Sequence, residues 1–107
     1  MNDQNREKGI QLLKDFYYSV KAGHATGPAV GDALVTTKVC VKELKATGSY
    51  KSYDYAVARF MGRVGRLIGY KDLVLDPEAR AAWRAIKTYT FEDIAEDLRQ
   101  VGGPALE

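Results

Sequence analysis

The stretch Ser52–Tyr70, SYDYAVARFMGRVGRLIGY, decides the fold, because its residues sort into three faces when it is read as a helix. Large apolar side chains recur at helical spacing and predict a face buried in a core: Tyr53, Val57, Phe60, Met61, Val64, Leu67 and Ile68. The three arginines of the segment exclude a membrane span. Ser52–Tyr70 is therefore predicted to be an amphipathic helix inside a folded protein.

A second face of this helix carries basic and aromatic side chains, which we call the Arg/Tyr stripe: Tyr55, Arg59, Arg63, Arg66 and Tyr70. Lys51 and Lys71 lie at its two ends. Arginine and tyrosine are enriched at the energetic centres of protein interfaces. They also serve nucleic-acid surfaces through phosphate contacts and base stacking. The stripe is therefore the predicted binding surface.

The third face is a strip of small residues: Ala58, Gly62, Gly65 and Gly69. A glycine inside a helix costs about 1 kcal/mol relative to alanine, so the strip suggests that something approaches the backbone closely. Another helix packed against it is the preferred interpretation, because small residues are common where helices cross. The alternative is a ligand or a nucleic-acid backbone lying beside the arginines.

The rest of the chain predicts an all-α protein, a single compact bundle of about five helices in which residues 1–107 form one domain. Apolar residues at helical spacing predict the other four helices: Asn2–Lys21, Pro28–Ala46, Pro77–Thr88 and Phe91–Val101. A strand at Leu34–Val41 is the rival interpretation of the second helix, because that segment is rich in β-branched residues.

Local signals set the later boundaries. Asp76-Pro77-Glu78 is typical of a helix start, with a capping carboxylate and proline in the first turn. Thr90–Asp93 resembles a capping box, around which Tyr89 and Ile94 would form a hydrophobic staple. Between the third and fourth helices, the link Lys71–Leu75 is expected to place its three apolar residues in the core.

Charge is distributed unevenly although the net charge is only +2. Residues 38–71 hold eight basic and two acidic side chains, whereas residues 72–107 hold four basic and eight acidic ones. Four carboxylates cluster in the last predicted helix: Glu92, Asp93, Glu96 and Asp97. This cluster is a predicted acidic interface, and it offers a second interpretation of the stripe. The arginines would then pair with these carboxylates, within the protomer or across a homo-oligomer.

Catalytic and metal-binding patterns are missing. The sequence has no GxSxG, P-loop, HExxH, EF-hand or CxxC motif, so we expect neither an enzyme nor a cofactor or metal site. Cys40 and His24 are the only residues of their types; we expect Cys40 to be buried and unreactive, Trp83 to lie in the core, and His24 to be structural. A polar N-terminus and the lack of a long apolar run predict a cytoplasmic protein without a membrane partner.

The segment Thr90–Gln100, TFEDIAEDLRQ, resembles the first helix of helix-turn-helix proteins in its Ile-Ala-Glu and Leu pattern. The resemblance is confined to this segment. No recognition helix follows it in the sequence, and its four acids would face phosphates, so it implies no DNA-reading residues.

These observations predict a non-enzymatic protein that binds a macromolecule. The first expectation is nucleic acid, or a nucleic-acid–protein complex, bound through the Arg/Tyr stripe. The alternative is a small adaptor or inhibitor that binds another protein through the stripe or the acidic cluster.

Overall fold

The computed structural model describes residues 3–47 and 50–94, most of which are helical, so the all-α prediction is confirmed. The elements in chain order are α1 (Asp3–Ser19), the π-helical turn η1 (Val20–His24), β1 (Ala25–Thr26), α2 (Val30–Ala46), α3 (Tyr50–Gly69), β2 (Val74–Leu75), α4 (Pro77–Thr88) and the π-helical segment η2 (Tyr89–Ile94). The α-helices of the described ranges number four rather than the expected five or so.

The predicted break before the last helix is wrong. Tyr89 has helical backbone angles, and α4 continues directly into η2. The hydroxyl of Thr90 donates to the carbonyl of Ile86, 2.9 Å away and one turn back, and therefore does not cap a new helix. Tyr89 is buried and donates its hydroxyl to the carbonyl of Asn5 at 2.7 Å, which ties this end of α4 to the start of α1. Of the expected helix Phe91–Val101, the part after Ile94 lies outside the described residues.

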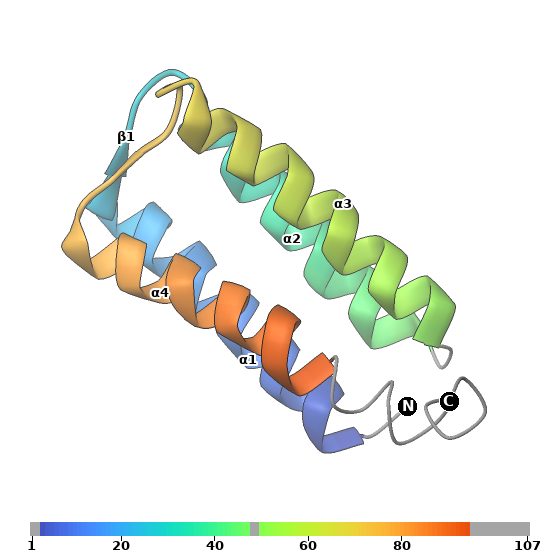
Figure 1. Ribbon diagram of the computed structural model, residues 1–107. Coiled ribbons are helices and arrows are strands. Elements are labelled where there is room, and N and C mark those ends of the chain that lie inside the picture. Colours follow the sequence, from blue (N-terminus) through green and yellow to red (C-terminus); the bar gives the residue numbers. More distant parts are fainter. Residues whose placement is uncertain (1–2, 48–49, 95–107) are drawn as a thin grey trace.

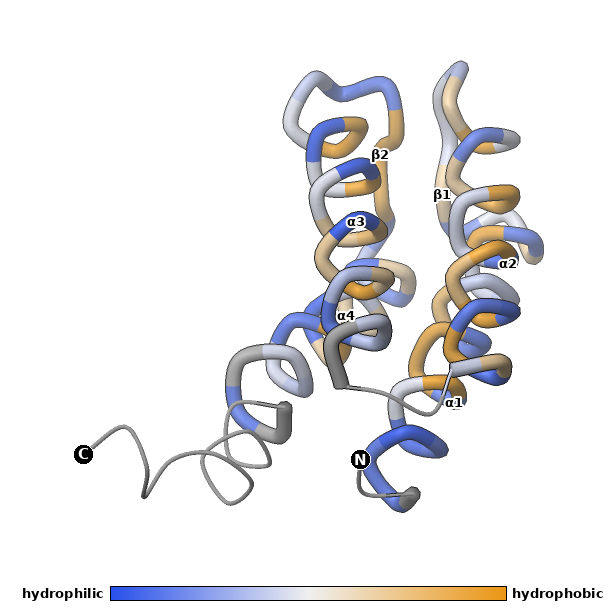
Figure 2. Tube along the Cα trace, turned by 90° about the vertical axis from the view of Figure 1, so that its right-hand side faces the viewer, coloured by the Kyte–Doolittle hydropathy of each residue, from blue (hydrophilic) through white to orange (hydrophobic). Residues whose placement is uncertain are grey.

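The helices form two layers (Figures 1 and 2). One layer holds α1 and α2, which pack against each other, and the other holds α3 and α4. Across the layers, α3 packs against α2 and α4 packs against α1. The backbones of α3 and α4, in contrast, diverge from each other in Figure 1 and do not pack closely.

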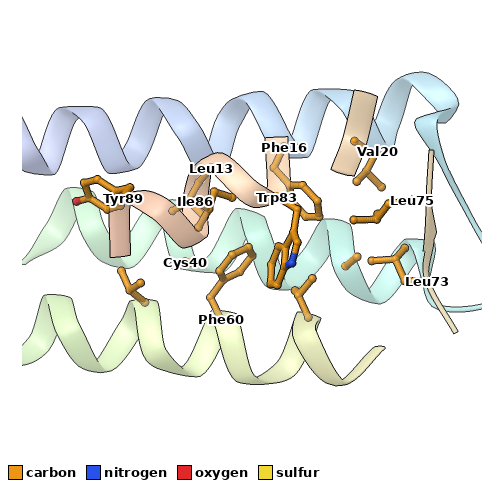
Figure 3. Packing of buried hydrophobic residues seen from close by; sticks show 14 of the residues in the cluster. Leu13, Phe16, Val20, Cys40, Phe60, Leu73, Leu75, Trp83, Ile86 and Tyr89 are labelled. Carbon is orange, nitrogen blue, oxygen red and sulfur yellow. The ribbon is translucent and has the colours of Figure 1, made fainter. Parts of the chain in front are cut away.

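Three aromatic rings form the centre of the core. Phe16 of α1, Phe60 of α3 and Trp83 of α4 lie with ring centroids 5.7–6.2 Å apart, in edge-on or tilted pairs. Figure 3 shows the indole of Trp83 reaching from α4 toward Phe60. Such pairs contribute about 0.5–1.5 kcal/mol each beyond the burial of their area. They connect α4 to α3, which the backbones alone do not.

The predicted core residues are found where the sequence placed them. Tyr53, Val57, Phe60 and Val64 of α3 are buried, while its remaining apolar residues pack against the core and are partly buried. Trp83 is 9% exposed. Cys40 is buried on α2, and burial raises the pKa of its thiol to about 12, so the thiolate that reacts is scarce at neutral pH.

A short antiparallel ribbon joins the two interhelical links, with Ala25 opposite Leu75 and Thr26 opposite Val74. The sequence predicted neither strand, and the rival strand at Leu34–Val41 is instead part of α2. Gly27 is required beside the ribbon: its φ is +110°, and a Cβ there would stand 2.4 Å from the carbonyl oxygen of Asp72.

The ribbon also corrects the expectation for the link between α3 and α4. Leu73 and Leu75 are buried as predicted, but Val74 is 49% exposed. Successive residues of an extended strand point to opposite faces, so only every second side chain can enter the core.

His24 fastens this end of the molecule to the start of α4. Its Nδ1 lies 2.7 Å from Asp76 Oδ2, and its Nε2 lies 2.8 Å from Glu78 Oε2. Asp76 caps α4 as predicted, accepting from the backbone N–H groups of Glu78 and Ala79 at 3.0 Å. The hydrogen bond to Asp76 is the main cause that raises the pKa of His24, and the Ala79 N–H and then His24 lower the pKa of Asp76.

We therefore expect stability to depend on pH through His24. Because its folded pKa lies above the unfolded value of about 6.5, its contribution is complete below that pH and is lost as pH rises through the folded pKa. His24→Gln should lower the melting temperature more at about pH 6 than at about pH 9. A difference between the two proteins that grows toward alkaline pH would contradict the assignment.

Candidate functional site

The Arg/Tyr stripe is exposed along α3. Tyr55 and Tyr70 are 65% and 74% exposed, and the three arginines between them also face solvent. Lys51 lies in the first turn of α3, and Lys71 follows its end. The guanidinium of Arg59 lies 5.3 Å from the centre of the Tyr55 ring, within the range of a cation–π contact. The helix thus presents these residues as the sequence predicts.

Two of the three arginines, however, are paired with carboxylates of α2. Arg63 makes a two-pronged contact with Asp32, with Nε 3.0 Å from Oδ1 and Nη2 2.9 Å from Oδ2. Arg59 pairs through Nη2 with Oε1 of Glu43. Hydrogen bonding from Arg63, aided by Thr36, lowers the pKa of Asp32. These pairs bridge α2 and α3 over a hollow of about 380 Å³. The two arginines and two carboxylates that line this hollow balance in charge.

Among the described residues, Arg59 and Arg63 do not pair with the acidic cluster, which was the second interpretation of the stripe. There the partners of Arg59 and Arg63 come from α2, whose two carboxylates the sequence analysis left unassigned. Glu92 is exposed in η2 and Asp93 belongs to the same segment, whereas Glu96 and Asp97 lie outside the described residues. Within the described part of the chain, Arg66 makes no ion pair.

Among the described residues, no helix crossing is found at Gly62 or Gly69, where the preferred interpretation of the small-residue strip expected one. A Cβ at either position would meet no described atom within 4 Å, and Ala58 is exposed. Only Gly65 has a neighbour, Cζ2 of Trp83, at the ordinary contact distance of 3.8 Å. Gly62 and Gly69 are themselves exposed, so in the described part of the chain no helix covers these two positions.

A second hollow, of about 520 Å³, lies between the end of α3, β2 and α4. Four exposed cationic side chains line it: Lys71, Arg80, Arg84 and Lys87. We call it the cationic hollow. None of the described residues that line it is acidic. Arg80 donates to the carbonyl of Leu75 at 3.3 Å, and the other three cations make no ion pair within the described residues.

The uncharged residues that line the cationic hollow are all apolar, and we call them its floor: Ile68, Leu73, Val74, Leu75 and Trp83. Val74 is 49% exposed, whereas Trp83 is 9% exposed. Leu73 and Leu75 lie in the core between Trp83 and the ribbon (Figure 3). Cations around an apolar floor favour an anion that also has an apolar or aromatic part.

Lys71 has an unusual backbone conformation for its residue type. Its φ is +63°, and it is the one non-glycine residue with positive φ in the described ranges. An L-residue in this region costs roughly 1–2 kcal/mol, which glycine avoids. Residues held this way concentrate at functional sites. Lys71 therefore lines the hollow in a backbone conformation that lowers the stability of the protein.

The cationic hollow was not predicted from the sequence, although the spacing of its basic residues pointed to it. Arg80, Arg84 and Lys87 are spaced as i, i+4 and i+7 and thus share one face of α4. Residues 72–107 carry a net negative charge, so a charge count over that whole range does not reveal these three cations. That Lys71 joins them is visible only once the ribbon folds the link back over α4.

Within the described residues, no group of three or more His, Cys, Asp or Glu side chains is placed to hold a metal ion. None of the helices in the described ranges has the length and apolar character needed to cross a membrane. No family model matches the chain, and neither the curated proteins nor the solved structures contain a match to it.

The pairing of Arg63 with Asp32 predicts a structural role that a charge exchange can measure. Arg63→Asp should lower the melting temperature, because it places two carboxylates side by side between α2 and α3. Asp32→Arg alone should also destabilise, by setting two guanidiniums together. Combining the two changes should recover much of the loss. Losses that simply add in thermal melts of the double variant would show that the two side chains do not interact.

Proposed function

We propose that the protein is a non-enzymatic nucleic-acid-binding protein that holds a phosphate backbone at the cationic hollow. The observation that supports this most strongly is the convergence of Lys71, Arg80, Arg84 and Lys87 on one hollow whose described lining contains no carboxylate. Binding to phosphates by arginine and lysine supplies most of the sequence-independent affinity for nucleic acids.

The spacing of the cations suits an extended chain of phosphates. Arg80 and Lys87 are seven residues apart on α4, which corresponds to about 10 Å along the helix axis. Lys71 lines the same hollow from the end of α3. A backbone that runs along α4 would therefore meet cations from α4 and from the α3 end, instead of a single point charge.

The Arg/Tyr stripe has a smaller part in this proposal than the sequence suggested. Arg59 and Arg63 already satisfy carboxylates of α2, so a phosphate would have to displace those partners. Arg66 and Tyr70 remain available at the end of α3 that leads to Lys71. They extend the positively charged surface beyond the hollow.

A salt titration of one charge reversal tests the proposal. With four phosphate contacts, the slope of log K against log salt for a single strand should be about −3, since each contact contributes about −0.7. Arg84→Glu should weaken binding for all sequences alike and should flatten the slope by about 0.7 or more. Fluorescence anisotropy of a labelled oligonucleotide provides both quantities. The melting temperature should not change, because Arg84 is exposed.

Lys42→Glu is the matched control. Lys42 is an exposed lysine on α2, in the other layer, and lines a different hollow. It should leave affinity and slope nearly unchanged, apart from the shift in overall charge. Equal losses for both variants would indicate a diffuse charge effect and no site. Failure of the wild type to bind any nucleic acid at low salt would contradict the proposal and favour the alternative, an adaptor that binds a protein.

A further inference from the structure

We infer that the cationic hollow takes a single-stranded nucleic acid and that one base of the strand lies on the apolar floor between the cations. This inference rests on the function proposed above and concerns the same site. It adds the class of nucleic acid and the part of the nucleotide that enters the hollow.

The cations alone do not account for the lining of the site. Phosphates need only the cations, yet apolar residues line the same hollow. Val74 is one of them and is 49% exposed, and Trp83 is another. Exposed apolar area of this kind is stabilised when an apolar surface covers it, at about 25 cal/mol per Å². A base supplies such a surface, and a phosphate does not.

Single strands and duplexes differ in which parts of their bases a protein can reach. In a duplex the base faces are stacked on one another, and only base edges are accessible from the grooves. In a single strand each base presents its face, which proteins cover with aromatic and apolar side chains beside a basic groove. The cationic hollow combines these two features, with four cations around Trp83 and Val74.

The floor is in place before any ligand binds. Val74 is fixed by pairing with Thr26 across the ribbon, and Leu73 donates its N–H to the carbonyl of Leu67 at 3.1 Å. Trp83 packs against Phe16 and Phe60. A site that is already formed avoids much of the cost of ordering side chains on binding.

Trp83 provides a direct readout, because it is the only tryptophan of the chain. Its emission should change when a base lies on the floor to which Trp83 belongs, and should not change when a ligand contacts only the cations. Three probes distinguish the cases: a single-stranded oligothymidylate of about ten nucleotides, a duplex of the same length, and an abasic oligomer with the same number of phosphates.

The expected result is that the oligothymidylate binds at least about fivefold more tightly than the abasic oligomer, and that it alone alters Trp83 emission. Equal affinity of all three probes with unchanged emission would overturn the inference, while the proposed function would stand. Absence of binding by all three probes at low salt would overturn both.

A variant of the floor supplies a second, independent test. Val74→Ala should weaken the oligothymidylate roughly threefold or more while leaving the affinity of the abasic oligomer unchanged. Val35→Ala is its matched control, since Val35 is also an exposed valine, 63% exposed on α2, and does not line the cationic hollow. The same loss for the abasic oligomer, or the same loss in the control, would contradict a base on the floor.

Discussion

The packing of Trp83 against Phe16 and Phe60 is the contact on which the rest of this structure depends. The backbones of α3 and α4 diverge, so the indole connects two helices that otherwise have little direct contact. A large aromatic side chain can span this gap, because it buries far more area than an aliphatic one and packs edge-on against other rings. With a small residue at this position, α4 would be held mainly by α1.

The same divergence creates the candidate site. Where α3 and α4 separate, the link between them folds back as β2 and brings Lys71 toward the cations of α4. Trp83 therefore belongs both to the core and to the lining of the cationic hollow. The hollow is shaped by the interior of the protein, so its geometry is fixed by core packing and by the ribbon, including the close approach of Gly27 to Asp72.

Periodicity predicted the helices well because each helix buries one face. The buried residues of α3, the cap at Asp76 and the burial of Cys40 and Trp83 all follow from local patterns of this kind. The boundary at Thr90 was mispredicted because a threonine hydroxyl can bond to a carbonyl one turn back as easily as it can cap a helix.

Long-range contacts lay beyond those patterns. The sequence identified the arginines of the stripe but not their partners, because Asp32 and Glu43 meet them only after α2 packs beside α3. The sequence likewise predicted that a helix packs against the glycine strip, but it could not show that Gly62 and Gly69 have no neighbour among the described residues. The pairing of His24 with Asp76 and Glu78, and the convergence of Lys71 with the α4 cations, depend on the same tertiary arrangement.

Lys71 allows the most direct test of the central claim, which is that the cationic hollow is maintained for an anionic ligand and not for the fold. Its left-handed backbone suits glycine, so Lys71→Gly should stabilise the protein by about 1 kcal/mol. The same change should weaken single-stranded oligonucleotide binding and flatten its salt slope by about 0.7. The decisive measurement is a thermal melt and an anisotropy titration on this one variant. A higher melting temperature with weaker binding is the predicted result, and unchanged binding would contradict the account.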